Sequence, residues 1–351
     1  MPKASIRRDD AQRPEWRLAE VASPHLDHPV PVVAAKDISY IPNGNRLQNL
    51  SIYLPKTPET SNLIGATANS LPHPDPQPLL PRYHVHIHGG AWRDPQLTSQ
   101  SVEPAVAHAF SATDAPVPIG GVASINYTLS QHPTHPTFPY DAIKDNHSDS
   151  AREAVHPQHV SDVLHGLALL GSFGLTDQSY ILSGHSAGAC LAFQAILQPP
   201  MHYGLDDLPE APCPAAILGL NGLYDLPELV TGLDASHEHL RAEYEMFLSS
   251  AFGADKSRWP AASPARFDPA EIAGRVREGK VPRLVVLDQS TEDQLVPMNQ
   301  SQRLEANLSK VSGLRVVQGH RCTGNHDAPW EQGVMIWDSL EDIVRLLQAG
   351  K

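Results

Sequence analysis

One serine lies among unusually small residues, where its hydroxyl could act as a nucleophile. Gly184 and Gly188 flank Ser186 in the segment GHSAG, after an apolar run typical of a buried strand (179–184) and before one typical of a helix (187–197). A strand that turns sharply into a helix strains its apex residue and tolerates only small neighbours. Such a turn exposes the hydroxyl at the helix N-terminus. We therefore predict a nucleophile at Ser186; the simpler alternative is an ordinary glycine-containing turn.

The segment HIHGGAW (86–92) offers backbone donors for a developing negative charge. Gly89 and Gly90 end a second apolar run, and without side chains their N–H groups can approach a substrate closely. Together with the N–H of Ala187 they would form an oxyanion hole, in which removal of one donor costs about 3 kcal/mol. A glycine turn at a strand end is the plain alternative. The chain order of the two segments favours the chemical interpretation.

A serine hydroxyl needs a base to take its proton, and the base needs a carboxylate to orient it. Asp293 lies in STEDQLVP and His326 in CTGNHDAPW, each on a loop that follows one of the last two predicted strands. Loops at the carboxyl ends of parallel strands meet at one edge of a sheet. We predict Asp293 as the acid and His326 as the base. The alternatives are Asp288, Glu292 and Asp225 as acids and His320 and His185 as bases.

Three histidines at alternate positions raise the question of a metal. His84, His86 and His88 share one face of a predicted strand, and His-x-His is a ligand spacing in some metal hydrolases. No carboxylate or cysteine accompanies them, and the strand lies in a sheet covered by helices. Histidines buried in the core with hydrogen-bond partners are favoured over ligands. We therefore expect no metal and no cofactor.

Composition narrows the class of protein. The 351 residues carry a formal charge of −13, which disfavours nucleic acid as a partner. No apolar stretch is long enough to span a membrane, and no secretory signal is visible. Cys190, Cys213 and Cys322 are few and lack metal-type spacing, as in a reducing compartment. We expect a cytoplasmic protein that acts on a small molecule, with no membrane partner; a homodimer is left open.

The elements that would position these residues alternate between strands and helices. Apolar runs predict about eight strands, and periodic apolar stripes predict helices between them and at the C-terminus (331–348). This pattern indicates an α/β fold with a mostly parallel central sheet and helices on both faces. We expect an irregular arm at 1–35 and one domain at 36–351. The predicted domain has a proline-rich insertion near 55–82 and a helical segment near 225–282.

Over residues 36–349 the chain resembles the α/β-hydrolase superfamily, in its hormone-sensitive-lipase-like branch. The His-Gly-Gly-x-Trp segment at 88–92, GHSAGA and GLYDL (222–226) are similar to the fungal type of kynurenine formamidase, or arylformamidase. Ala91 stands where the branch usually has a third glycine. The resemblance implies hydrolysis of N-formyl-L-kynurenine to L-kynurenine and formate, a step of tryptophan degradation that supplies NAD precursors. It implies Ser186, Asp293 and His326 as the triad and Gly89, Gly90 and Ala187 as oxyanion donors.

An aromatic leaving group would gain from packing on aromatic side chains. Trp92 and Tyr224 are the candidates, although Trp92 could equally be a packing residue below the loop. Arg93 is a candidate for binding the amino-acid carboxylate. The main alternative function is a carboxylesterase acting on small or aryl esters with the same catalytic residues. A zinc amidohydrolase and a catalytically inactive binding protein are less favoured.

Overall fold

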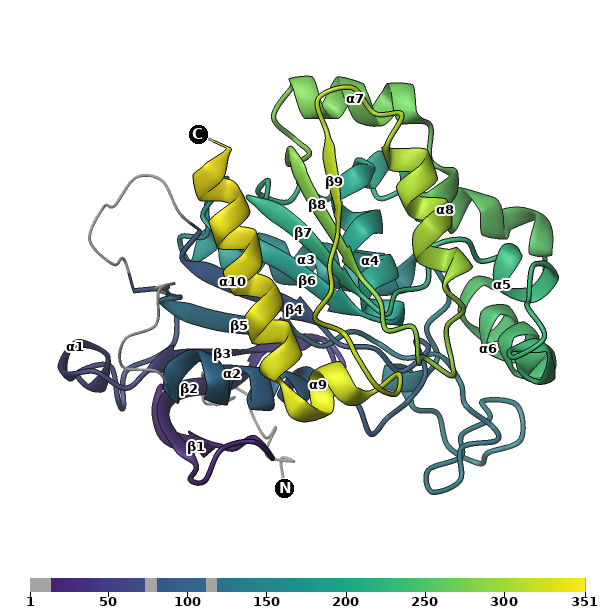
Figure 1. Cartoon of the computed structure of the whole chain (residues 1–351). Helices are drawn as coiled ribbons and strands as arrows, with labels where there is room; N and C mark the ends of the chain where they lie inside the picture. Colours follow the sequence, from purple (N-terminus) through teal and green to yellow (C-terminus); the bar gives the residue numbers. More distant parts are fainter. Residues whose placement is uncertain (1–13, 73–80, 112–118, 351) are drawn as a thin grey trace, which may run out of the picture.

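The computed structural model describes residues 14–72, 81–111 and 119–350, and these form one nine-stranded sheet covered by helices (Figure 1). The strand order is β1-β2-β3-β5-β4-β6-β7-β8-β9. The strands are β1 (Arg17–Val21), β2 (Val30–Ser39), β3 (Asn49–Pro55), β4 (Tyr83–Ile87), β5 (Gly121–Ile125), β6 (Tyr180–His185), β7 (Ala216–Leu220), β8 (Leu284–Asp288) and β9 (Arg315–Gln318).

The sheet is antiparallel at one side and parallel over the rest. The pairs β1–β2, β2–β3 and β3–β5 are antiparallel, whereas β5, β4, β6, β7, β8 and β9 run parallel to one another. The predicted α/β fold with a mostly parallel sheet is therefore confirmed. In a parallel sheet the carboxyl ends of all strands lie at the same edge, where ligands usually bind. The loops after β4, β6, β8 and β9 meet at this edge.

Strand β1 is the ninth strand, and it lies inside the stretch that we expected to be irregular. Its five residues pair with the first half of β2, so that Val21 lies opposite Val30. Trp16, only 2% exposed, anchors the segment through backbone hydrogen bonds to Gly65 and Ala66. The sequence of β1, RLAEV, does not alternate regularly between apolar and polar residues, and Leu18 is exposed, so the pattern does not predict a strand. Strands β2 and β3 form an antiparallel hairpin, with Ile38 opposite Leu50.

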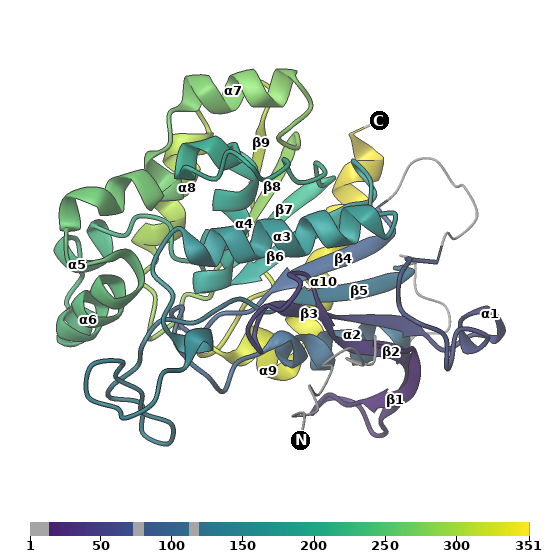
Figure 2. The same ribbon diagram turned by 180° about the vertical axis from the view of Figure 1, so that it is seen from behind.

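Helices cover both faces of the sheet. Helices α3 (Gln158–Ser172) and α4 (Ala187–Leu197) pack on one face, and α2 (Glu103–Ser111) and α10 (Val334–Ala349) pack on the other (Figures 1 and 2). Every residue of α4 is buried, which explains why its sequence is apolar or small except at Gln194, whose amide donates to the Ala262 carbonyl oxygen. The remaining helices are α1 (Pro58–Ser61), α5 (Glu228–Thr231), α6 (Arg241–Phe252), α7 (Pro269–Arg277), α8 (Asn299–Leu308) and α9 (Ala328–Gln332). No helix among the described residues is long and apolar enough to cross a membrane.

Three segments with predicted features can be compared with the structure. The segment 225–282 contains the helices α5, α6 and α7, joined by turns and short 3-10 helices. The C-terminal stripe is divided into α9 and α10 at Gly333, which has a φ of 76° and touches the backbone of α2. Part of the proline-rich stretch, residues 73–80, lies outside the described residues, and the part before it includes α1 and the buried Leu71.

The small residues around Ser186 are required because two backbones touch there. A Cβ atom at Gly188 would overlap the carbonyl oxygens of Ile87 and His88 at the end of β4. A Cβ atom at Gly184 would overlap the carbonyl group of Gly188 itself. Only hydrogen atoms fit in these gaps, so α4 can start directly against β4 and β6.

Replacing Gly188 by alanine should therefore destabilise the protein. Overpacking against backbone atoms that cannot move costs about 3 kcal/mol or more of the free energy of unfolding. The matched control is Gly171→Ala in α3, where the nearest atom to a new Cβ is 3.5 Å away. That variant should be as stable as the wild type or slightly more stable. Urea unfolding of both variants measures the difference, and equal stabilities would contradict the packing argument.

Several histidines are buried in the neutral form. Burial lowers the pKa of His84 and His159 to about 3 and that of His88 and His185 to about 4. His84 and the neighbouring His86 both hydrogen-bond the Ser183 hydroxyl, at 2.6 and 2.7 Å. The unfolded chain has ordinary imidazoles with a pKa of about 6.5. Below that pH the unfolded state takes up protons that the folded state does not, so acidification favours unfolding.

The free energy of unfolding should thus be greatest above about pH 6.5 and decrease as the pH falls toward the folded pKa values. Between pH 7.5 and pH 5.0 we expect a loss of at least about 3 kcal/mol, since each such group contributes up to about 1.4 kcal/mol per pH unit. Urea unfolding at the two pH values measures the loss. His239→Gln, which changes an exposed histidine, should leave the pH dependence as it is. Equal stability at both pH values would rule out this account.

Candidate active site

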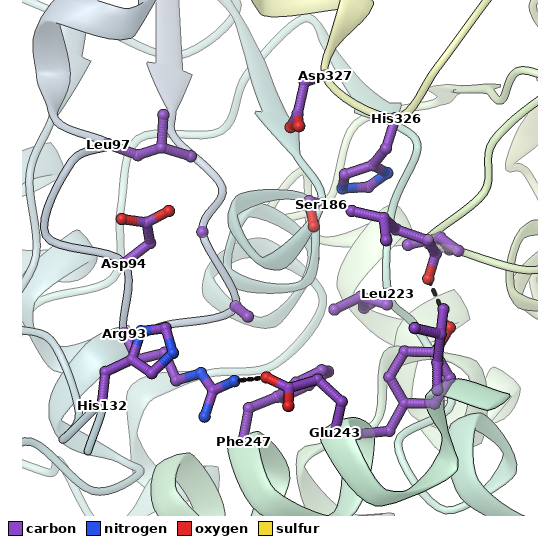
Figure 3. A pocket seen from close by; sticks show the side chains of 16 residues that line it. Arg93, Asp94, Leu97, His132, Ser186, Leu223, Glu243, Phe247, His326 and Asp327 are labelled. Carbon is purple, nitrogen blue, oxygen red and sulfur yellow. Dashed lines mark hydrogen bonds and ion pairs between the residues drawn. The ribbon is translucent and has the colours of Figure 1, made fainter. Parts of the chain in front are cut away.

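The predicted site residues come together at the carboxyl edge of the sheet. Gly90, Ser186 and His326 line one cavity of about 310 Å³. They come from the loops after β4, β6 and β9. Asp293, from the loop after β8, lies behind His326. Figure 3 shows the Ser186 side chain beside the His326 ring on one wall of the cavity. The structure thus brings together four loops that are far apart in the sequence.

The Ser186 backbone has the strained conformation that a sharp strand–helix turn requires. Its φ of 54° and ψ of −120° are rare for a residue with a side chain. The Ser186 N–H donates to the Leu220 carbonyl oxygen at 2.9 Å, which ties the turn to the end of β7. Ala187 is the first residue of α4, so its N–H has no acceptor within the helix. The hydroxyl therefore stands at a helix N-terminus that has free donors.

His326 is oriented by Asp293. The distance from His326 Nδ1 to Asp293 Oδ2 is 2.8 Å, and both side chains are buried. The other carboxylate oxygen, Oδ1, accepts the N–H groups of Leu295 and Val296, each at 2.9 Å. Because a carboxylate only accepts hydrogen bonds, the ring carries its proton on Nδ1. That tautomer leaves the lone pair of Nε2 available to accept a proton.

The alternative acids have other partners. Asp288 accepts the N–H groups of Arg321 and Cys322, at 3.1 and 3.0 Å, and so holds the loop after β9. Glu292 accepts the Gly324 N–H at 2.9 Å. Asp225 pairs with Arg266 at 2.7 Å. None of these three acids is among the residues that line the described cavity.

The alternative bases also differ from His326. His320 is exposed and does not line the described cavity. His185 is buried directly beside His326, with 4.7 Å between the ring centroids, but its Nε2 is bonded to the His326 carbonyl oxygen at 2.8 Å. Since a carbonyl only accepts, Nε2 of His185 carries the proton. His185 thus supports the backbone of His326.

Asn221 is a site residue that sequence reasoning missed. Its Nδ2 donates to the His326 carbonyl oxygen at 3.0 Å, and its Oδ1 accepts the Ser290 N–H at 2.9 Å. One side chain therefore holds the two loops that carry Asp293 and His326. Asn221 comes directly after β7 with a φ of 44°, but nothing in the sequence indicates which distant groups its side chain meets.

The glycine loop after β4 is held in an unusual conformation. Gly90, Ala91 and Trp92 have φ values of 93°, 48° and 59°, three successive residues in the left-handed region. The Tyr127 hydroxyl fixes the loop through the carbonyl oxygen of Gly89, at 2.9 Å. A Cβ atom at Gly89 would lie 3.1 Å from the Cβ atom of Ser186, so this loop directly contacts the serine.

The two aromatic residues expected to touch a substrate do not line the cavity. Trp92 is fully buried and packs against Phe252, with 4.9 Å between ring centroids. Tyr224 is 1% exposed and packs edge-on against Phe193. Both rings are therefore core residues, packed against other aromatic side chains. The apolar wall of the cavity is instead formed by Leu97, Leu223, Leu240, Phe247, Leu295 and Val296.

His84 and His86 of β4, together with His88 just after it, do not form a metal-ligand group. His84 and His86 share the Ser183 hydroxyl, and His88 stacks on Tyr127. Among the described residues, one group could hold an ion: the ligand atoms of His185, His326 and Asp327 lie within 4.8 Å of one another. Nδ1 of His326 is engaged by Asp293, so a metal would bind Nε2, the nitrogen that a general base needs.

Comparisons with known proteins identify hydrolases that are similar in sequence to this chain. The chain is 33% identical over 317 residues to the kynurenine formamidase-like hydrolase fscH of Fusarium equiseti. This alignment covers 89% of this chain and 94% of the relative. It is 32% identical over 268 residues to the kynurenine formamidase avaC of Aspergillus versicolor, with coverage of 72% and 85%. No family model matches the sequence.

Solved structures with this fold are esterases and lipases. Esterase B of Lactobacillus rhamnosis aligns with a TM-score of 0.56 at 17% identity, over 91% of this chain and 85% of that one. A hormone-sensitive lipase from a metagenome library aligns with a TM-score of 0.50 at 17% identity, over 98% and 88%. These likenesses concern the fold, which is the α/β-hydrolase fold. The sequence relatives establish the family: the chain belongs to the kynurenine formamidase family of hydrolases.

Proposed function

We propose that the protein hydrolyses the formamide bond of N-formyl-L-kynurenine, giving L-kynurenine and formate. The relatives' names support this substrate. The observation that carries the proposal is that Ser186 and His326 line one cavity while Asp293 bonds the far nitrogen of the His326 ring at 2.8 Å. The reaction is a step of tryptophan degradation that supplies NAD precursors. A cytoplasmic location would suit the three cysteines, which are free and buried.

In the proposed reaction His326 takes the proton of the Ser186 hydroxyl on Nε2, and the serine oxygen attacks the formyl carbon. The imidazolium that forms is stabilised by the Asp293 carboxylate, whose position the N–H groups of Leu295 and Val296 fix. His326 then gives its proton to the departing aniline nitrogen, which leaves as the amine. Water attacks the formyl-enzyme by the reverse sequence and releases formate.

The charge of the tetrahedral intermediate would rest on backbone N–H groups. We assign this role to Gly89, Gly90 and Ala187, which lie against the serine turn or at the start of α4. Donors held in place before the reaction stabilise the transition state without reorganising. The Tyr127 hydroxyl contributes by fixing the glycine loop through the Gly89 carbonyl oxygen.

The shape of the cavity suits a small acyl group and a larger aromatic leaving group. A formyl carbon carries only hydrogen, so it needs no acyl pocket beyond the serine turn. The aryl ring would pack on the apolar wall, where Phe247 replaces Trp92 and Tyr224 as the aromatic partner. The volume of about 310 Å³ lies in the range of small-molecule sites.

Replacing Ser186 by alanine should abolish hydrolysis and leave the fold intact. We expect kcat to fall by at least about 10⁴-fold, because loss of the nucleophile removes the covalent route. Steady-state hydrolysis of N-formyl-L-kynurenine and urea unfolding measure the two effects. The control Ser172→Ala changes an exposed serine in α3 and should have no effect on either. On the wild type, a much higher kcat/KM for 4-nitrophenyl acetate than for the formamide would replace the proposal by the carboxylesterase alternative.

Removing metal ions should leave hydrolysis unchanged, because the proposed chemistry uses a serine. Incubation with EDTA should keep the rate of formamide hydrolysis within the error of the assay, whereas a serine-directed phosphonate should stop it. Excess Zn²⁺ should inhibit, since it would occupy Nε2 of His326 between His185 and Asp327. Loss of activity with the chelator together with resistance to the phosphonate would instead support a zinc amidohydrolase.

A further inference from the structure

One wall of the cavity carries a buried positive charge that the reaction above does not use. The Arg93 side chain is 3% exposed and forms an ion pair with Glu243, which is 47% exposed. Arg93 comes from the loop after β4 and Glu243 from α6, and both line the cavity. Figure 3 shows this pair on the wall of the cavity away from Ser186 and His326.

The guanidinium of Arg93 is only partly satisfied. Its Nη2 donates to Glu243, whereas its Nη1 is buried and has no hydrogen-bond partner among the described residues. A guanidinium has five donors and commonly binds a carboxylate through two of them. A buried charge with an unpaired donor costs free energy unless a ligand supplies the acceptor. The guanidinium thus keeps an unused donor, which a second carboxylate would satisfy.

None of the other ionisable groups that line the described cavity offers a second cation for a substrate carboxylate. Asp94 also lines the cavity and carries negative charge, as Glu243 does. His132 lines the cavity as well, and burial together with the nearby Arg93 lowers its pKa to about 4, so it is neutral at physiological pH. Among the described residues that line the cavity, Arg93 is therefore the cation, and Asp94, Glu243 and Asp327 are the acids.

The position of Arg93 is coupled to that of the glycine loop. Its backbone N–H donates to the Gly90 carbonyl oxygen at 2.9 Å, as does that of Asp94. The guanidinium also stacks over the Phe247 ring, with 5.7 Å from its central carbon to the ring centroid. A ligand whose carbonyl lies on the glycine loop would thus meet a cation at a fixed separation from its reacting end.

We propose that Arg93 and Glu243 form a subsite for a free α-amino acid group, with the substrate carboxylate bound to Arg93 and the substrate ammonium bound to Glu243. The inference rests on the proposed function, because it places the opposite end of the same molecule at Ser186. It assigns specificity: the protein prefers aryl formamides that carry a free zwitterionic amino acid. The competing explanation is that the ion pair only ties the loop after β4 to α6.

The test compares two formamides that differ only in the amino acid group. N-formyl-L-kynurenine carries it, and 2-formamidoacetophenone lacks it while keeping the reacting bond and the aryl ketone. Arg93→Gln should lower kcat/KM for N-formyl-L-kynurenine at least about 30-fold more than for the neutral formamide, mainly through KM. Arg93→Lys should recover part of the difference because the charge is kept. Arg258→Gln, which changes an exposed arginine outside the cavity, is the matched control.

Glu243→Gln tests the ammonium contact separately. This variant should have a lower kcat/KM for N-formyl-L-kynurenine. It should have a higher kcat/KM for 4-(2-formamidophenyl)-4-oxobutanoate, an analogue with a carboxylate and no ammonium, because Arg93 then loses its internal partner. Equal losses on charged and neutral formamides in the Arg93 variants would mean that the ion pair is structural, and would overturn the subsite while the proposed function stands. A wild type that hydrolyses neither formamide would overturn the proposed function, and the subsite with it.

A measurement on the wild type alone covers the case in which Arg93→Gln does not fold. L-kynurenine should inhibit competitively at least about tenfold better than 2-aminoacetophenone, which lacks the amino acid group. Higher salt should reduce this preference, because Glu243 is half-exposed and salt screens its contact with the ammonium group. Equal inhibition by the two amines would overturn the subsite.

Discussion

The site depends on how the backbone carbonyl oxygen of His326 is held. His185 Nε2 and Asn221 Nδ2 donate to it, at 2.8 and 3.0 Å, from the ends of β6 and β7. His326 lies on an irregular loop between β9 and α9, where an unsupported backbone would not fix the position of the ring. Two donors anchored in the sheet remove that freedom, and Asp293 then sets the ring's rotation. A base that must reach a serine within a fraction of an ångström needs both constraints.

A second constraint acts between the serine turn and the glycine loop. Gly188 lies directly against the carbonyl oxygens at the end of β4, so the turn that carries Ser186 and the loop that carries Gly89 are spaced by backbone contact. Side-chain rotamers do not enter this spacing. The distance between a nucleophile and the donors facing it is thereby built into the sheet, and buried neutral histidines such as His84 and His86 fill the space behind it.

The sequence predicts the parts of this arrangement that local pattern determines. The strand–turn–helix around Ser186, the loops of Asp293 and His326 and the mostly parallel sheet follow from periodicity and chain order. The supporting roles of Asn221 and His185 could not be predicted, because each depends on which distant carbonyl the side chain meets. For Trp92 the residue type was misleading. An aromatic ring suits substrate contact, but with a φ of 59° at this residue the ring is buried in the core.

The segment between β7 and β8 lines the cavity but carries none of the three proposed catalytic side chains. Helix α6 and its N-terminal neighbour supply Leu240, Glu243, Tyr244 and Phe247 to the cavity, whereas the proposed nucleophile, base and acid all come from other loops. Substitutions in this segment can therefore change which molecules the cavity admits without altering the side chains proposed to break the bond.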